Sequence, residues 1–206
     1  MDAQLRAGVA VYNAGHYHAA HDAWEAEWLD LPDGDDERFL HGLIQFTAAV
    51  YHARERNWSG ATGLAESAGE YLADLPPDYR GVNVGRVREY LTDLARDPER
   101  IERGPAPALT HEGEAVGLGD LDFEASTVAA AVLAGDLGYD EDAIERAVEY
   151  ARADLESGDE GSEFVRFLFD FVREADHRAV VVQRLSEHVD RREHRESDVD
   201  GLFEQR

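Results

Sequence analysis

Hydrophobic residues in the first half of this chain recur at intervals of three and four, the spacing that places them on one face of an α-helix. Glycines, prolines and an acidic loop interrupt the pattern. It predicts successive helices over residues 3–13, 17–29, 37–56, 58–75 and 84–95. Because the connections are short, we expect neighbouring helices to pack antiparallel as a bundle.

The helical spacing stops after residue 103. A group of helix-breaking residues follows, comprising Gly104, Pro105, Pro107, Gly113, Gly117 and Gly119. Residues 104–120 are therefore predicted to form a linker or an extended strap. Helical spacing resumes and predicts helices over residues 123–136, 141–156 and 163–195.

These patterns predict an all-α fold, an antiparallel helical bundle with an additional C-terminal helical region. The expected parts are a helical domain over residues 1–103, the Gly/Pro-rich break over 104–120, and an acidic helical extension over 121–206. The apolar residues around Phe167 are too numerous for a free surface helix, so they either pack on the first domain or form a subunit interface. We favour packing of the extension on the first domain.

The chain has a large excess of acidic residues, which distinguishes it from an ordinary helical bundle. The chain has 45 acidic and 20 basic residues, for a formal net charge of −25, and every basic residue is an arginine. Molar salt shortens the Debye length to about 3 Å and screens the resulting self-repulsion. The acidity therefore predicts adaptation to a saline cytoplasm. A disordered acidic chain is excluded, because 43% of the residues are hydrophobic and occur in periodic blocks.

Composition also excludes several functions. The absence of cysteine excludes disulfides, thiolate zinc sites and a cysteine nucleophile. The longest uncharged stretch, residues 39–53, is too short and polar to cross a bilayer, and no signal peptide is visible, so a cytoplasmic location is expected. Nucleic acid is not an expected partner, because the only dense basic run lies at residues 191–195.

The helix over residues 37–56 contains one polar stripe. His41, Gln45 and His52 lie within about 40° of each other around the helix axis, on an otherwise apolar element. A buried imidazole or amide without a hydrogen bond costs about 1–3 kcal/mol. We therefore expect these three side chains to have polar partners.

The preceding helix offers such partners. His21 and Glu25 are four residues apart, so they lie one turn apart on one face, with two tryptophans beside them. If the two helices are antiparallel neighbours, their polar faces meet against an aromatic wall. The candidate pocket consists of His21, Trp24, Glu25, Trp28, His41, Gln45 and His52.

Several interpretations of this pocket remain open. We favour a buried hydrogen-bond network that fixes the helix register. The alternatives are a divalent-metal site formed by His21, Glu25 and His52, a metal-free catalytic or ligand pocket, and a partner-binding groove. Trp24 and Trp28 are more typical of core residues than of a ligand platform. No cofactor is required by any motif, and whether the chain is an enzyme stays open.

Four stretches resemble a known family. Residues 12–28 (YNAGHYHAAHDAWEAEW), 41–45 (HGLIQ), 51–52 (YH) and 57–61 (NWSGA) are similar to the signature of domain-of-unknown-function family 309. The resemblance covers about residues 8–75. The chain departs from the family pattern at Asp22, where glutamate is usual, and at His41, where glutamine is common.

The resemblance implies a small all-helical fold and no particular activity. The sequence therefore predicts a cytoplasmic helical module with a binding or scaffolding role, acting on an unidentified protein or small molecule. A small enzyme or a divalent-metal-binding protein is the alternative. The oligomeric state is open, and neither a membrane nor nucleic acid is expected as a partner.

Overall fold

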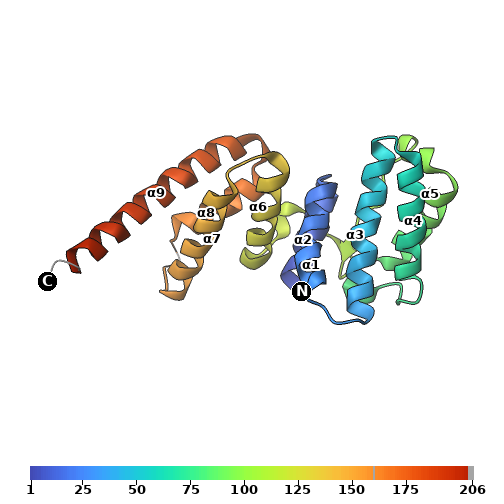
Figure 1. Cartoon of the computed structure of the whole chain (residues 1–206), viewed down its shortest axis with the longest axis horizontal. Coiled ribbons are helices and arrows are strands. Elements are labelled where there is room, and N and C mark those ends of the chain that lie inside the picture. Colours follow the sequence, from blue (N-terminus) through green and yellow to red (C-terminus); the bar gives the residue numbers. More distant parts are fainter. Residues whose placement is uncertain (160, 204–206) are drawn as a thin grey trace. The chain divides into compact units, whose positions relative to one another are not determined.

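The computed structural model describes residues 1–159 and 161–203, with side chains up to residue 198 (Figure 1). Helices make up most of the described residues, which confirms the all-α prediction. The chain divides into two compact units, Met1–Val132 and Leu133–Arg206. Within the described ranges, no helix combines the length and apolar character needed to cross a membrane.

The first unit begins with five α-helices that pack in order of sequence, each against the next. Their bounds lie within a few residues of the predicted ones: α1 (Asp2–Asn13), α2 (Tyr17–Leu29), α3 (Asp35–Arg54), α4 (Trp58–Leu72) and α5 (Val84–Arg96). Figure 1 shows α3, α4 and α5 side by side, as the short connections predict.

Close packing between α1 and α2 depends on a glycine. A Cβ atom at Gly8 would lie only 2.1 Å from Nε1 of Trp24, whose side chain is fully buried. The Trp24 indole therefore rests directly on the backbone of α1, and its Nε1 donates to the carbonyl oxygen of Leu5 at 3.4 Å. Gly15, with φ of 90°, allows the turn between the two helices.

The Gly/Pro-rich segment is held against α1 as a strap. It contains an antiparallel pair of short strands, β1 (Thr110–His111) and β2 (Glu114–Ala115). Asn13 at the end of α1 brackets this pair: its Nδ2 donates to the carbonyls of Leu109 at 2.8 Å and Val116 at 2.9 Å. Short 3₁₀ helices lie nearby: η1 (Tyr79–Gly81), η2 (Pro98–Glu102) and η3 (Leu118–Asp120).

The boundary between the units lies beyond the strap. It falls inside α6 (Phe123–Leu137), between Val132 and Leu133. Residues 104–120 thus belong to the first compact unit, whereas the sequence pattern divided the chain at this segment.

In the described part of the second unit, the end of α6 is followed by three helices that each contact the other two. They are α7 (Glu141–Glu156), α8 (Glu163–Arg173) and α9 (Arg178–Phe203), with the 3₁₀ turn η4 (Ala175–His177) before α9. The prediction of one continuous helix over residues 163–195 was therefore wrong.

Arg178 explains this break. Its buried guanidinium donates from Nε to the carbonyl of Phe171 at 3.0 Å and from NH2 to that of Val172 at 3.2 Å. These contacts satisfy carbonyl groups at the end of α8 that a helix terminus leaves unpaired. The chain can then reverse, so that the apolar faces of α8 and α9 cover each other.

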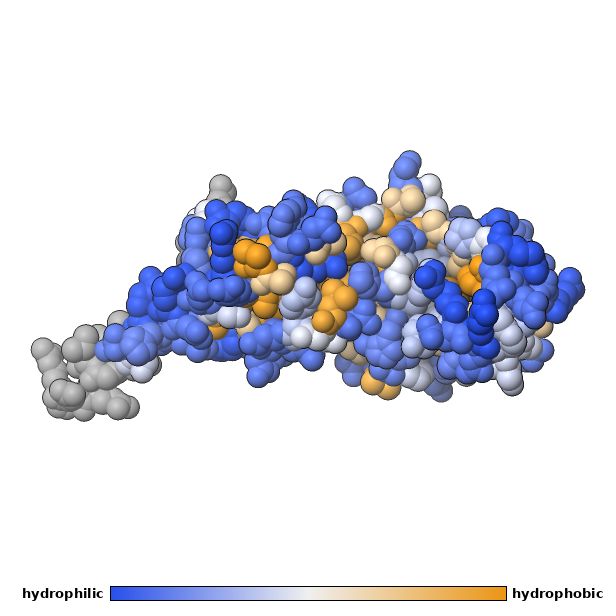
Figure 2. Space-filling model, turned by 90° about the horizontal axis from the view of Figure 1, so that it is seen from above, coloured by the Kyte–Doolittle hydropathy of each residue, from blue (hydrophilic) through white to orange (hydrophobic). Residues whose placement is uncertain are grey.

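Polar residues cover most of the surface visible in Figure 2, and the hydrophobic residues there form small separate areas. Large hydrophobic side chains with substantial exposure are scattered along the sequence at Leu29, Tyr51, Leu137, Leu155 and Val180. Single exposed apolar residues of this kind are normal on a protein surface.

Candidate functional site

Three potential metal ligands gather on one side of α2. The side chains of His21, Asp22 and Glu25 each offer a nitrogen or oxygen atom, and these atoms all lie within 4.8 Å of one another. Helical spacing brings Glu25 one turn beyond His21, while Asp22 lies between them in sequence. We call these three residues the α2 cluster.

A second histidine borders the α2 cluster. Nδ1 of His18 lies 3.3 Å from Oδ2 of Asp22, and the rings of His18 and His21 stack with centroids 6.2 Å apart. The His18 side chain is 67% exposed, against 30% for His21. Asp22 therefore lies between one exposed imidazole and one that is largely covered.

The neighbouring carboxylates raise the pKa of His21. Its Nδ1 lies 3.0 Å from Oδ1 of Asp22, and this hydrogen bond, followed by the charge of Glu25, raises the pKa of His21 although burial opposes the shift. The same hydrogen bond lowers the pKa of Asp22. A proton shared with Asp22 and a metal cation would therefore compete for His21.

One imidazole nitrogen with two carboxylates is a donor set that suits zinc, iron or manganese. All three ligands come from a single helix, and the side chains of His21 and Asp22 remain 30% and 39% exposed. A bound ion would thus keep coordination positions open to water or to another ligand.

This cluster differs from the predicted metal set of His21, Glu25 and His52. The structure places His52 in the last turn of α3, half-exposed, with Nδ1 2.9 Å from Nδ2 of Asn57. Asn57 is the residue that caps α4, accepting from the backbone of Gly60 at 3.1 Å. His52 therefore belongs to the α3–α4 corner. The residue that lies beside His21 and Glu25 is Asp22 rather than His52.

His41 and Gln45 belong to a different group of side chains. Nε2 of Gln45 lies 3.0 Å from Nε2 of His41, and the His41 ring lies between those of Tyr71 and Trp28, with centroid distances of 3.9 and 4.5 Å. These rings connect α2, α3 and α4. We call Trp28, Glu37, His41, Gln45 and Tyr71 the aromatic network.

Glu37 joins two members of the aromatic network. Its Oε1 accepts from Nε1 of Trp28 at 2.7 Å and lies 3.5 Å from Nδ1 of His41. The second contact is an ion-pair distance without hydrogen-bond geometry, so Nδ1 of His41 is buried with no hydrogen-bond partner among the described residues. Oε1 of Gln45 is also buried, and no residue in the described part of the chain donates a hydrogen bond to it.

The predicted pocket residues thus separate into groups. His21 and Glu25 lie in the α2 cluster, Trp28, His41 and Gln45 lie in the aromatic network, Trp24 lies in the core, and His52 lies at the corner. Sequence reasoning missed Asp22, Glu37 and Tyr71. Two of them had a signal, because Asp22 follows His18 by four residues and Glu37 precedes His41 by four.

Two comparisons relate this chain to known proteins. A family model described as Domain of unknown function (DUF309) matches residues 5–64, which include the α2 cluster. An uncharacterised protein of Aquifex aeolicus (strain VF5) is 26% identical over 90 residues, which are 44% of this chain and 27% of that relative. Neither description carries an activity, so the function of this chain is unknown, and its N-terminal helices are similar to a domain family of unknown function.

Proposed function

We propose that the first unit is a helical binding module that holds a divalent metal ion at the α2 cluster. The observation that carries this proposal is the approach of the three ligand atoms of His21, Asp22 and Glu25 within 4.8 Å of one another. Ligand atoms at about 2.1 Å from a zinc ion lie about 3–4 Å apart, so small side-chain rotations would complete the site.

The donor chemistry indicates which ions fit. Calcium and magnesium prefer sites made only of oxygen ligands, whereas the imidazole of His21 favours zinc, iron or manganese. With three protein ligands, the remaining positions are available to water and to a small molecule or protein that reaches the exposed face of α2. This exposed position is the basis for a binding role, and no residue of the chain is assigned a catalytic step.

Elemental analysis tests the proposal directly. The full chain, purified without chelator or affinity resin, is expected to contain stoichiometric zinc, iron or manganese, or to take up one of these ions during dialysis. Protein that stays free of metal after dialysis against each ion would contradict it. That result would favour the competing function, a module that acts through its shape and partners without a metal.

The competing function has its own support. The Nδ1 atom of His21 is already matched with Asp22 at 3.0 Å, so the cluster has a satisfied hydrogen bond in the absence of an ion. The aromatic network likewise has a structural role available, because it joins three helices through ring contacts and hydrogen bonds. Metal analysis separates the two functions because only the first requires a cation.

We also propose that the module works in a saline cytoplasm. The net charge of −25 and the complete use of arginine for basic residues support this environment. The same charge disfavours nucleic acid and anionic membrane surfaces as partners. A small molecule or protein partner is therefore the proposed class.

A further inference from the structure

The strap contains four consecutive residues, 107–110, whose backbone is held by side chains of the helical bundle; we call them the docked segment. Nδ2 of Asn13 donates to the carbonyl of Leu109 at 2.8 Å, and its Oδ1 accepts from the N–H of the same residue at 2.9 Å. On the same helix, the hydroxyl of Tyr12 donates to the carbonyl of Pro107 at 3.1 Å. Helix α1 therefore contacts the backbone of alternate residues of the docked segment.

Asn83, which precedes α5, contacts the intervening residues. Its Nδ2 donates to the carbonyl of Ala108 at 3.0 Å, and its Oδ1 accepts from the N–H of Thr110 at 3.0 Å. In a β-strand the backbone N–H and C=O groups of successive residues point to opposite edges, so the docked segment has the hydrogen-bonding pattern of a strand between two neighbours. The side chains of Asn13 and Asn83 take the place of those neighbouring strands.

Asn83 occupies a position at which asparagine usually has another role. It is the N-cap residue of α5, where an asparagine side chain typically accepts from a backbone N–H in the first turn of the helix. Among the described residues the Asn83 side chain accepts no such capping bond, and both ends of its amide contact the docked segment instead. The amide is therefore used to recognise a peptide backbone rather than to stabilise α5.

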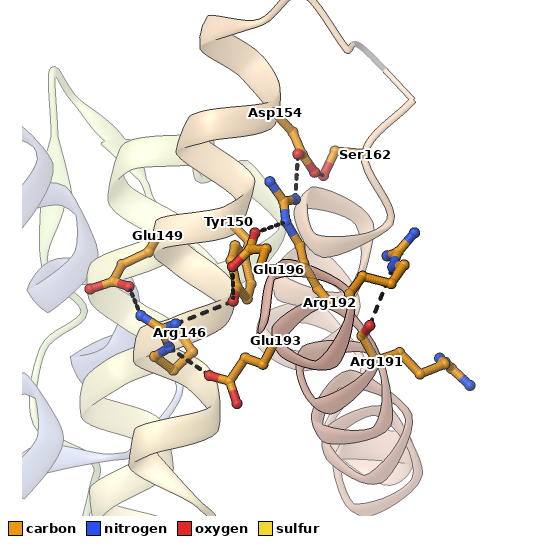
Figure 3. Close-up of polar contacts among 10 residues, drawn as sticks. Arg146, Glu149, Tyr150, Asp154, Ser162, Arg191, Arg192, Glu193 and Glu196 are labelled. Carbon is orange, nitrogen blue, oxygen red and sulfur yellow. Dashed lines mark hydrogen bonds and ion pairs between the residues drawn. The ribbon is translucent and has the colours of Figure 1, made fainter. Parts of the chain in front are cut away.

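This mode of attachment differs from the one that joins helices in the second unit. There, α7 and α9 are joined by contacts between side chains, among them Arg146 with Glu193 at 2.9 Å and the Tyr150 hydroxyl, which donates to Glu196 at 3.0 Å (Figure 3). Such contacts require a particular residue on both helices. Contacts from a side chain to a backbone require a particular residue on one side alone, so a different peptide can make them.

Leu109 supplies the side-chain anchor of the docked segment. It is fully buried, and it is the one buried residue among residues 104–115. The residues on either side of the docked segment, 103–105 and 112–115, are exposed. The docked segment is thus attached through its backbone and one aliphatic side chain, and its displacement would uncover little of the core.

We propose that Tyr12, Asn13 and Asn83 form a peptide site that binds an extended segment of a protein partner. The docked segment occupies this site within the chain, and the partner's segment replaces it. The β1–β2 pair has a backbone contact of its own, from the N–H of Glu112 to the carbonyl of Gly81 at 2.9 Å, so the rest of the strap can stay in place during the exchange. The peptide site includes no residue of the α2 cluster, so it stands whether or not a metal binds there.

The contacts define the sequence that the peptide site accepts. An aliphatic side chain is required at the position of Leu109, and backbone N–H groups are required there and at the position of Thr110. Proline, which lacks an N–H group, is excluded at those two positions. It is accepted at the position of Pro107, where the contact uses the carbonyl. The partner's segment is therefore an extended peptide with unblocked backbone N–H groups around one leucine, isoleucine or valine.

The test uses a fluorescently labelled peptide with the sequence of residues 104–113 and full-length variants in which the docked segment is weakened. Leu109→Asp places a charge at the buried anchor, and Leu109→Ala removes most of its side chain. Both variants should bind the peptide saturably in fluorescence anisotropy, at least about tenfold more tightly than the wild type, in which the docked segment occupies the site. Ala115→Asp adds the same charge at an exposed position of the strap and should bind as the wild type does.

Modified peptides show whether binding uses the backbone. N-methylation at the leucine or at the threonine removes an N–H group that an asparagine accepts, and should weaken binding to Leu109→Asp by about tenfold. N-methylation at the alanine before the leucine should change binding little, because none of the contacts to the peptide site uses that N–H group. Adding Asn83→Ala to Leu109→Asp should weaken binding of the unmodified peptide by about tenfold or more, since two contacts are lost.

Three results would overturn the proposal. The first is the absence of saturable binding to both Leu109 variants, measured at a potassium chloride concentration at which circular dichroism shows folded helices. The second is equal weakening by N-methylation at all three positions of the peptide. The third is loss of the helical signal in both variants at every salt concentration, because the first unit would then need the docked segment in order to fold.

Discussion

Nδ1 of His21 lies 3.0 Å from Oδ1 of Asp22, the next residue on α2. This contact raises the pKa of the imidazole and lowers that of the carboxyl group. Protonation of His21 would oppose the binding of a divalent cation at the α2 cluster, so a lower pH would favour the metal-free cluster.

The His21–Asp22 pair should stabilise the fold over a defined pH window. The raised pKa of His21 gives stabilisation that is lost as pH rises through it, and the lowered pKa of Asp22 gives stabilisation that is lost as pH falls through it. The contribution is thus complete between about pH 4 and pH 6.5, the ordinary values of the two groups. Its size should be about 1 kcal/mol or less, because solvent screens this partly exposed pair.

Asp22→Asn tests this pair in metal-free protein. The substitution removes the hydrogen bond to a charged acceptor, so the pKa of His21 should fall toward its ordinary value. Titration of the His21 ring protons by nuclear magnetic resonance measures the midpoint, with His52 as an internal reference. An unchanged His21 midpoint in the variant would show that Asp22 does not control its protonation.

Gly8→Ala should strongly destabilise the first unit. The new Cβ atom would lie 2.1 Å from Nε1 of Trp24, and this fully buried indole cannot move without disturbing the core. A loss of about 1–3 kcal/mol or more is expected from such overpacking. Gly63→Ala is the control, because a Cβ atom at this position in α4 meets nothing within 4 Å and should stabilise the helix by about 0.5–1 kcal/mol. Urea unfolding measures both values, and a stable Gly8→Ala variant would refute this packing of α1 on α2.

His41→Ala should cost more stability than His52→Ala. Removing His41 takes away the ring between Trp28 and Tyr71 and leaves Gln45 without its hydrogen-bond partner, at a cost of about 1–3 kcal/mol. His52 is half-exposed and contacts Asn57, so its loss should cost only about 0.5 kcal/mol. The free energies of unfolding of the two variants, measured at matched salt, test this difference. Equal losses of stability in the two variants would contradict a stabilising network around His41.

The helices could be predicted because glycine and proline mark their ends and apolar residues mark their buried faces. Residues 17–29 and 141–156 were predicted with the bounds that the structure shows. The break after Arg173 could not be predicted, because the side chain that satisfies the carbonyl groups at the end of α8 comes from Arg178, on the next helix. The hydrophobic periodicity of the sequence does not indicate that contact.

The candidate site was only partly predictable for a geometric reason. A helical projection gives the angle of a residue but not its height, and seven residues separate Gln45 from His52, or about 10 Å along the axis. Residues that share a face can therefore join different groups. Gln45 contacts His41 one turn away, while His52 contacts Asn57 at the corner. Asp22 departs from the resembled family pattern, where glutamate is usual, yet the structure places it inside the cluster.

Salt should stabilise the chain through its charge. With a net charge of −25, the midpoint of thermal unfolding is expected to rise steeply between about 0.1 M and 2 M potassium chloride as screening sets in. Sucrose at concentrations that stabilise ordinary proteins is the control, because it does not screen carboxylates. A midpoint that stays flat in potassium chloride would remove the support for the saline environment.

The most direct test of the proposed function is a calorimetric titration of metal-free protein with zinc and with manganese at pH 7.5. Wild-type protein should bind one of these ions, and His21→Gln and Glu25→Gln should each weaken that binding by about tenfold or more, as the loss of a metal contact does. His52→Gln, which removes a histidine outside the α2 cluster, should bind as the wild type does. Binding that is unchanged in Glu25→Gln and lost in His52→Gln would contradict a metal site on α2.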